Sequence, residues 1–261
     1  MEIEVIYQLI KQRLFILLCF LSLILFIAFI LYHKPAPDDQ KVVQNTAVTG
    51  GKGGDTLVVL LHAYTARGDK LGEIREVLGS LDEYSDADFI IPDLPFGLFS
   101  MESSSKVTAE LVSAIDQAWD NRVHAQNPYK RVILIGHSMG ALYARKLFVV
   151  ASGENEDARF ESDLRTLLAD SAYDVKKPRP WAHAVDRIIQ LAGMNRGWSI
   201  SHHMSIPRAI QMEIGVIAGR IFEWVYGRPP IIFTIRRGAP FITQLRLQWL
   251  EMKKQAHEKG L

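Results

Sequence analysis

The segment RVILIGHSMGA at residues 131–141 constrains the fold of this chain more than any other. A run of Val, Ile and Leu leads into the pattern G-x-S-x-G, formed by Gly136, Ser138 and Gly140, and helix-favouring residues follow at once. The bare pattern arises by chance in about one chain in ten of this length, whereas a strand before it and a helix after it make it specific. The segment therefore predicts a sharp strand–turn–helix with Ser138 in the turn.

Ser138 is the candidate nucleophile in this turn. The residues two before and two after it approach each other so closely that side chains would collide, which accounts for Gly136 and Gly140. The turn exposes the Ser138 hydroxyl above the sheet. It also directs the backbone N–H of Met139, at the helix N-terminus, toward the point where negative charge develops on an attacked carbonyl. Met139 is therefore a candidate donor of an oxyanion hole.

Short apolar runs alternate with longer amphipathic ones through most of the chain. Strands are expected at residues 56–61, 89–91, 131–135 and 187–191, and helices at residues 70–81, 103–121 and 139–151. Strands of near-continuous Val, Ile and Leu that are separated by helices predict an α/β fold with a parallel sheet covered on both faces. Such a sheet carries its chemistry at the carboxyl ends of the strands. Residues 153–180 are charged, and we expect them to form a solvated excursion over the surface.

An uncharged apolar run, LFILLCFLSLILFIAFIL, occupies residues 14–31. Its length suits a helix that crosses a hydrocarbon core of roughly 30 Å. A cleaved signal peptide is the alternative, but its apolar stretch is usually about 7–15 residues and ends in small residues, whereas this run ends in FILYHK. We predict a tail at 1–13 and an uncleaved single-pass anchor in the lipid bilayer at 14–31. Two basic residues flank each end, and we favour a cytoplasmic N-terminus with an extracytoplasmic domain.

Composition limits the other partners. Lys and Arg number 30 against 29 Asp and Glu, so no strong field favours nucleic acid. The single cysteine, Cys19, forms no internal disulfide, and no Cys/His cluster suggests a metal site; we expect neither metal nor organic cofactor. Residues 32–54 are typical of a polar, glycine-rich tether, which places the folded domain at 55–261. The sequence assigns no oligomeric state.

A second amphipathic stretch occupies residues 207–226. Its Ile and Trp residues recur at helical spacing, with charged residues elsewhere on the helical wheel. Such a helix most often packs on its domain. Because it follows a core strand, a lid over an apolar substrate site is the alternative, with residues 198–238 as the candidate cap.

The chain resembles the lipase and esterase branch of the α/β-hydrolase family. Members often have His-Gly-x after an early strand and Gly-His-Ser-Met-Gly at the nucleophile; here strand 56–61 is followed by His62, Ala63 and Tyr64. By this resemblance His62 is the motif histidine, and Tyr64 supplies the second backbone N–H of the oxyanion hole. Ala63 stands where the family usually has glycine. The segment QLAGMNRGW at 190–198 is similar to a lipase segment after the next core strand, and the resemblance spans residues 55–254.

The resemblance implies the fold and the activity together. The expected fold is an α/β-hydrolase-type parallel sheet with flanking helices, preceded by one N-terminal transmembrane helix. The implied reaction is hydrolysis of a carboxylic ester, with a small ester or an acyl lipid as substrate, through an acyl-enzyme on Ser138. Thioesters, amides and acyl transfer to an alcohol use the same nucleophile and stay open.

The acid and histidine of a catalytic triad are not evident. In this fold they follow the nucleophile in the order Ser, Asp or Glu, His, yet no aspartate follows Asp186, and one helical stretch at 245–258 ends the sequence. At about 30 residues per strand–helix unit, the sequence is short by roughly 50 residues. We expect it to be the front part of a longer hydrolase. The alternative is a non-catalytic, membrane-tethered binding module.

Internal residues offer candidates for the missing groups, but surface positions are the default interpretation for the three later histidines, His202, His203 and His257. His137 adjoins the nucleophile and is expected to point away from it, while His62 is expected to tie down its loop. The position after strand 187–191, where some hydrolases carry the acid, holds Met194 and Asn195. Asp170 and Asp174 lie in the charged excursion.

Overall fold

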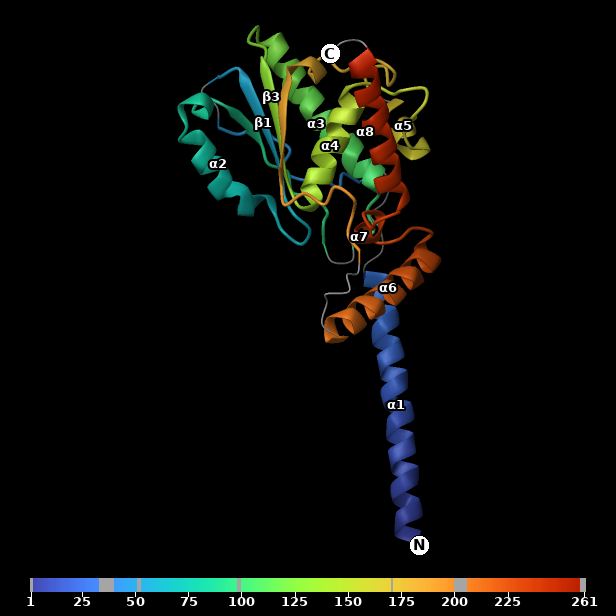
Figure 1. The fold of residues 1–261 in the computed structure, drawn as a ribbon. Coiled ribbons are helices and arrows are strands. Elements are labelled where there is room, and N and C mark those ends of the chain that lie inside the picture. Colours follow the sequence, from blue (N-terminus) through green and yellow to red (C-terminus); the bar gives the residue numbers. More distant parts are fainter. Residues whose placement is uncertain are drawn as a thin grey trace.

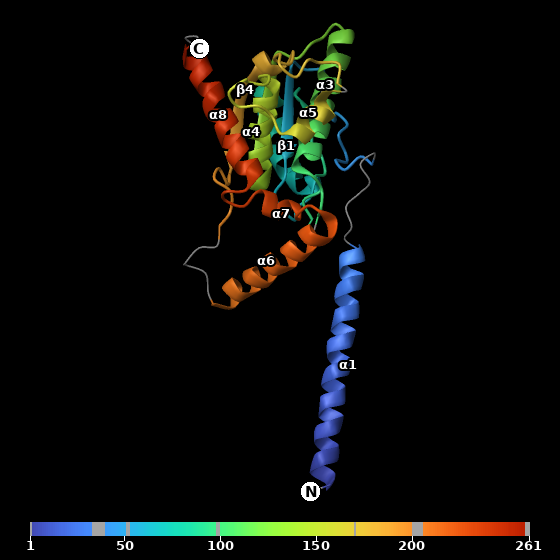
Figure 2. The ribbon, with the colours of Figure 1, turned by 90° about the vertical axis from the view of Figure 1, so that its right-hand side faces the viewer.

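The computed structural model describes residues 2–32, 40–50, 53–97, 100–169, 171–199 and 206–258, with side chains from residue 11 in the first helix and from residue 213 in the sixth. A long N-terminal helix, α1 (Glu2–Tyr32), projects from a domain built on one sheet (Figures 1 and 2). The strands are β1 (Thr56–Leu61), β2 (Asp88–Ile90), β3 (Arg131–His137) and β4 (Val185–Leu191). The α-helices of the domain are α2 (Gly72–Gly79), α3 (Ser104–His124), α4 (Met139–Ala151), α5 (Ser162–Ala169), α6 (Ile206–Tyr226), α7 (Ile231–Thr234) and α8 (Pro240–Glu258). Short 3-10 turns occupy Gly68–Leu71, Asp82–Tyr84 and Ala182–Ala184.

The four strands form a parallel sheet in the order β2-β1-β3-β4. Every residue of β1 is buried, because helices cover both faces of the sheet. Leu57, Val59 and Leu61 point into the larger core with α3, α4 and α8, while Val58 and Leu60 point into a smaller core with α2. The predicted α/β fold class is confirmed.

Local sequence predicted the central elements closely. Strand 56–61 and helix 139–151 have the predicted bounds, and β3 runs two residues further than predicted, to His137. The predicted helix 70–81 is a 3-10 turn followed by the shorter α2, and the last helix begins at Pro240, five residues before its predicted start. These differences lie at element ends, where capping decides the boundary.

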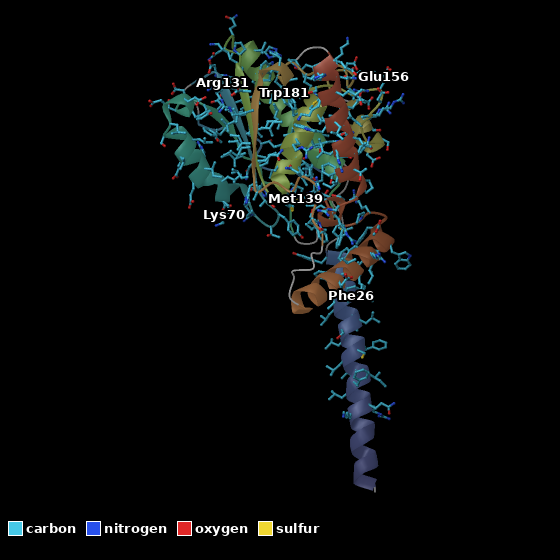
Figure 3. All side chains as sticks on the ribbon, in the orientation of Figure 1. Phe26, Lys70, Arg131, Met139, Glu156 and Trp181 are labelled. Carbon is cyan, nitrogen blue, oxygen red and sulfur yellow. The ribbon has the colours of Figure 1, made fainter. Side chains whose placement is uncertain are left out.

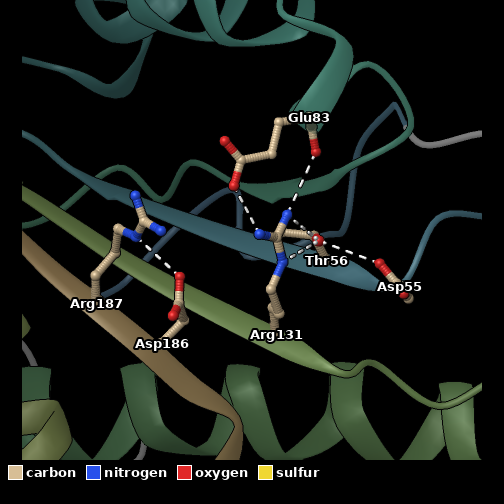
Figure 4. Close-up of polar contacts among 6 residues, drawn as sticks. All are labelled: Asp55, Thr56, Glu83, Arg131, Asp186 and Arg187. Carbon is tan, nitrogen blue, oxygen red and sulfur yellow. Dashed lines mark hydrogen bonds and ion pairs between the residues drawn. The ribbon is translucent and has the colours of Figure 1, made fainter.

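The amino ends of the strands carry a charged network, away from any predicted site residue (Figure 4). Arg131, at the start of β3, donates from Nη1 to Oε1 of Glu83 at 2.6 Å and from Nε to Oγ1 of Thr56 at 3.3 Å. Arg187 and Asp186 pair on the neighbouring β4, with 2.8 Å between Nε and Oδ2. This edge of the sheet therefore carries partly exposed ion pairs.

Part of the expected tether packs on the domain. The side chain of Val43 is fully buried, and the backbone N–H of Val43 donates to the Glu110 carboxylate of α3 at 2.7 Å. Further along, Thr49 pairs with Phe89 of β2 in an isolated antiparallel bridge. The interpretation of residues 32–54 as a flexible tether was therefore wrong for residues 42–49, because two valines and a carboxylate 67 residues away hold this stretch to the core.

The excursion at residues 153–180 was also misjudged. It contains α5, whose Leu164 and Leu168 are buried, and Phe160 lies in the larger core. Near its end, Arg179 is only 3% exposed. Some of the charges that suggested solvation are buried or half-buried because they form ion pairs: Arg179 pairs with Asp116 of α3, and Glu161 pairs with Lys146 of α4.

The carboxyl ends of the strands face α6, α7 and the nearer end of α1. Met139, just after β3, lies on this side of the domain, while Arg131 and Trp181 lie on the opposite side (Figure 3). From α7, helix α8 runs back along α4 to the opposite side, where the C-terminus lies (Figure 1). Any chemistry at the carboxyl edge therefore takes place on the side of the domain that faces α1.

Candidate active site

The turn between β3 and α4 has a strained backbone at Ser138. This residue has φ 52° and ψ −111°, a region that side-chain-bearing residues seldom occupy. Ser138 is half-buried, and Met139 begins α4 directly after it. The strand thus delivers the serine to the carboxyl edge of the sheet, and the helix N-terminus follows immediately. A strained residue of this kind is a mark of function rather than of stability.

The glycines on either side of Ser138 are sterically required. A Cβ on Gly136 would lie 2.4 Å from the carbonyl oxygen of Gly140, and a Cβ on Gly140 would lie 2.3 Å from the carbonyl oxygen of Leu61. Both contacts are with backbone atoms, which cannot move aside as a flexible side chain does. The sequence pattern G-x-S-x-G therefore has a physical cause in this structure.

Strand β4 holds the turn from the other side. The backbone N–H of Ser138 donates to the carbonyl oxygen of Leu191, the last residue of β4, at 2.8 Å. Ala192, the next residue, also has a positive φ of 48°. Local sequence carries no signal for this bond, because it depends on the register between β3 and β4, in which His137 lies opposite Leu191.

The loop after β1 lies against the turn. The Gly140 contact involves the carbonyl oxygens of Leu61 and His62, so this loop and the start of α4 are neighbours. The loop carries Tyr64, which is half-buried against the larger core. The predicted second oxyanion donor therefore comes from a loop that touches the turn. The roles of Tyr64 and Met139 as backbone donors stay predictions.

His62 is structural, as its sequence context indicated. It is 1% exposed; its Nε2 accepts from the backbone N–H of Leu94 at 2.8 Å, and its Nδ1 lies 2.8 Å from the carbonyl oxygen of Ala63. An acceptor role for Nε2 requires the proton on Nδ1, which then donates to Ala63. Both ring nitrogens are thus occupied by backbone groups. His62 ties the loop after β1 to the loop after β2, and it has no nitrogen left to act as a base.

Acid should destabilise the domain through His62. Burial lowers the pKa of His62 below 6.5, so the unfolded chain takes up the proton first, and the free energy of unfolding falls as the pH drops below that value. Protonation also removes the acceptor for Leu94. We expect the melting temperature in detergent to fall less between about pH 7.5 and pH 5.5 in His62→Gln than in the native chain, although the substitution costs about 1–3 kcal/mol at the higher pH.

The matched control is His137→Gln, which changes an exposed histidine and should keep the pH dependence of the native chain. An unchanged dependence in His62→Gln would show that another group causes the acid sensitivity.

The other predicted histidines and acids are scattered. His137 is exposed at the end of β3, and His257 is exposed near the end of α8, on the side of the domain opposite Met139. Asp174 is exposed and accepts from the backbone N–H of Lys176 in a local turn. Asp170, His202 and His203 lie outside the described residues. The structure therefore brings Ser138, Gly136, Gly140, Met139 and the loop of Tyr64 together. His137 adjoins Ser138 in the chain with an exposed side chain, and neither His257 nor Asp174 lies at this turn.

A tryptophan that the sequence did not single out organises the carboxyl edge. Trp198, in the segment after β4, donates from Nε1 to the carbonyl oxygen of Ile232 in α7 at 2.6 Å. Its backbone also pairs with residues 235 and 237. Gly197, with φ 74°, leaves room for this approach, since a Cβ there would lie 2.4 Å from the carbonyl oxygen of Ile235. The segment after β4 is thereby fixed to the chain that follows α6.

Among the described residues, no group of three or more His, Cys, Asp or Glu side chains is placed to hold a metal ion. A recess of about 640 Å³ lies between α5 and residues 171–176, lined by a mixture of charged, polar and small apolar side chains. Of the described candidate residues, only Asp174 lines it.

A model of the alpha/beta hydrolase family matches residues 58–250. A search of curated proteins found no match. Among solved structures, the chain is similar to esterase PE8, at 20% identity over 42% of this chain and 59% of that chain, with a TM-score of 0.29. It is similar to phospholipase PlaB from Legionella pneumophila, at 18% identity over 76% of this chain and 36% of that chain (TM-score 0.41), and to acyl-protein thioesterase 2 from Zea mays, at 12% identity over 69% and 96% (TM-score 0.32). The chain thus spans less than two thirds of the first two proteins.

Proposed function

Because this chain belongs to the alpha/beta hydrolase family, we propose that it is a membrane-anchored serine hydrolase that cleaves carboxylic esters through an acyl-enzyme on Ser138. The observation that carries this proposal is the backbone of Ser138, held at φ 52° and ψ −111° between two glycines that admit no side chain. A turn of this shape costs free energy of about 1–3 kcal/mol. Presenting a nucleophile at the edge of the sheet is the use that explains it.

The proposed reaction uses backbone groups at the carboxyl edge. The Ser138 hydroxyl oxygen attacks the ester carbonyl, and the negative charge that develops on the carbonyl oxygen is stabilised by the backbone N–H groups of Met139 and Tyr64. Collapse of the tetrahedral intermediate expels the alcohol and leaves an acyl group on Ser138, which water then removes. A base must accept the serine proton; His202 and His203, in the segment after Trp198, are the first candidates to test.

Acyl lipids are the proposed substrate class. Helix α1 contains an apolar span at Lys11–Tyr32, long enough to cross a bilayer. We propose that it anchors the chain by a single pass, with the domain on the extracytoplasmic side. The carboxyl edge that bears Ser138 lies on the side of the domain toward α1 (Figure 3). An ester drawn from the bilayer would therefore reach the serine over a short path.

Labelling with a fluorophosphonate probe tests the nucleophile. We expect the detergent-extracted native chain to be labelled and Ser138→Ala to lose all labelling, because the probe reacts only with an activated serine. Ser80→Ala, which changes an exposed serine after α2, is the matched control and should label normally. A membrane-impermeant probe on intact cells tests the side of the membrane.

Each outcome of the labelling separates the two candidate functions. If Ser138→Ala is still labelled, the nucleophile is a residue other than Ser138. If the folded native chain is not labelled at all, the enzyme proposal fails and the non-catalytic binding module takes its place. If labelling depends on Ser138, loss of labelling in His202→Ala or His203→Ala would identify the base.

A further inference from the structure

One face of α6 is apolar and exposed. Ile214 is 62% exposed, Ile217 58% and Trp224 85%. Together with the half-buried Ile221 they are spaced by three, four and three residues, which places all four on one side of the helix. We call these four residues the α6 stripe. Another side of α6 carries Val216, Gly219 and Phe222, all buried. Packing on the domain therefore accounts for one side of α6 and leaves the stripe uncovered.

The stripe continues onto α1. Phe222 of α6 is buried in a small cluster with Ile30 of α1, and Ile221 packs against the same cluster. The rings of Phe222 and Phe29 meet edge to face, with centroids 5.9 Å apart. The hydroxyl of Tyr226 donates to the carbonyl oxygen of Ile30 at 2.7 Å. Since Ile221 belongs to both the stripe and this cluster, the exposed face of α6 adjoins the surface of α1.

These contacts fix the depth of α6. The apolar span of α1 ends at Tyr32, and residues 26–30, which form the α1 side of the cluster, lie about 3–9 Å from that end at 1.5 Å per residue. Helices that lie in a membrane interface bury their apolar side about 5–10 Å into the headgroup and acyl boundary. The two depths agree. Figures 1 and 2 show α6 between the domain and the free length of α1.

Other residues of α6 suit the same position. Glu213, Arg220 and Glu223 are exposed as well. Glu213 and Arg220 border the stripe along one edge, since they lie four residues before Ile217 and Trp224, and Glu223 lies further round the helix. Trp224, in the stripe, is a residue type enriched at membrane interfaces. A helix with one packed side and an exposed apolar stripe that charged residues border fits a surface where lipid, water and protein meet.

We propose that α6 is an interfacial helix whose stripe lies in the headgroup and acyl boundary of the bilayer that α1 crosses. This rests on the proposed function only for the anchor, since it needs α1 to span the membrane. The helix then gives the domain a second attachment beside α1. From α6 the chain leads to α7, which accepts the hydrogen bond from Trp198 after β4. The carboxyl edge with Ser138 is thereby held toward the lipid surface.

Depth-dependent quenching in the full chain tests the proposal. Cys19, in the middle of the α1 span, is the only cysteine, so a fluorophore on the native chain reports on the anchor. In a Cys19→Ser background, Ile217→Cys places the same fluorophore on the stripe. The matched controls are Glu223→Cys, an exposed position of α6 outside the stripe, and Val77→Cys, a 62% exposed position on α2. Each labelled chain is reconstituted into phosphatidylcholine vesicles that contain lipids with a nitroxide at a shallow or a deep position.

The expected result is a loss of fluorescence at position 217 that is larger with shallow than with deep nitroxides, and a loss at Cys19 that is larger with deep ones. Positions 223 and 77 should be quenched by aqueous iodide instead. If Cys19 responds as expected but position 217 responds only to iodide, α6 is not interfacial, although the anchor stands. If position 217 is shielded from iodide and lipid alike, a protein surface such as a second copy covers the stripe, and the proposal is wrong.

If no nitroxide lipid quenches the label at Cys19, both the proposed membrane anchor and the proposed interfacial helix are wrong. The fluorophosphonate labelling of Ser138 does not depend on either. The test of α6 therefore fails separately from the test of the hydrolase.

Discussion

Gly140→Ala is expected to destabilise the chain by about 3 kcal/mol or more and to slow fluorophosphonate labelling about 100-fold. The added Cβ would lie 2.3 Å from the carbonyl oxygen of Leu61 and 2.7 Å from that of His62. Overpacking against a rigid neighbour costs about 1–3 kcal/mol and occasionally more, and here the neighbours are backbone atoms of a central strand. Relief requires the β1 loop and the start of α4 to separate, which moves Tyr64 away from Met139. A displacement of about 1 Å costs about 100-fold in rate.

Gly79→Ala is the matched control for this substitution. Gly79 ends α2, and an added Cβ there would meet nothing within 4 Å, so the change should be neutral or stabilise by up to about 1 kcal/mol. Thermal unfolding in detergent and the labelling rate are measured on both variants. A Gly140→Ala chain that melts and labels like the native chain would contradict the close approach of the β1 loop to α4, and the oxyanion-hole assignment would fail with it.

Local sequence predicted the buried strands and the turn at Ser138, because short-range patterns determine both. An uninterrupted apolar run is a buried parallel strand wherever helices flank it, and two glycines around a serine after such a strand permit one tight turn. The sheet and the Ser138 turn follow from these patterns. The hydrogen bond from Ser138 to Leu191 does not, because it joins residues 53 positions apart through the pairing of β3 with β4.

The two errors in the sequence analysis share a physical cause. The prediction for residues 42–49 came from the polar and glycine-rich segments that flank them, and the prediction for residues 153–180 came from their charges; average polarity indicates solvent exposure. In each, a few side chains decide the outcome through distant partners. Val43 is buried, and its backbone N–H donates to the Glu110 carboxylate; Arg179 is buried and pairs with Asp116. Pairing of this kind depends on tertiary structure, so a single sequence gives no signal for it.

Asp116→Leu is expected to destabilise the chain by about 3–5 kcal/mol, because it leaves Arg179 buried without its carboxylate. Asp116, on α3, pairs with Nη1 of Arg179 and accepts from Nε1 of Trp181 at 2.7 Å. Arg179 is 3% exposed and Trp181 fully buried, so water cannot replace the lost acceptor. Both residues lie just before β4, whose last carbonyl holds the Ser138 turn. Labelling of Ser138 should therefore weaken along with stability.

The double variant Asp116→Leu/Arg179→Met tests whether the ion pair itself, rather than the burial of two side chains at these positions, contributes to stability. Burial raises the pKa of the Asp116 carboxyl to about 6, although the nearby Arg179 charge opposes this shift. The cost of desolvating the carboxylate is therefore larger than its attraction to Arg179. Because the folded pKa is raised, the contribution of this carboxyl to the free energy of unfolding is lost as the pH rises from about 4 to 6. An apolar pair avoids that cost, and we expect the double variant to recover most of the stability that Asp116→Leu loses. Lys130→Ala, which breaks the exposed pair of Lys130 with Asp55, should change the free energy of unfolding by less than about 1 kcal/mol. If the double variant is as unstable as Asp116→Leu, the Trp181 bond rather than the ion pair holds β4 in place.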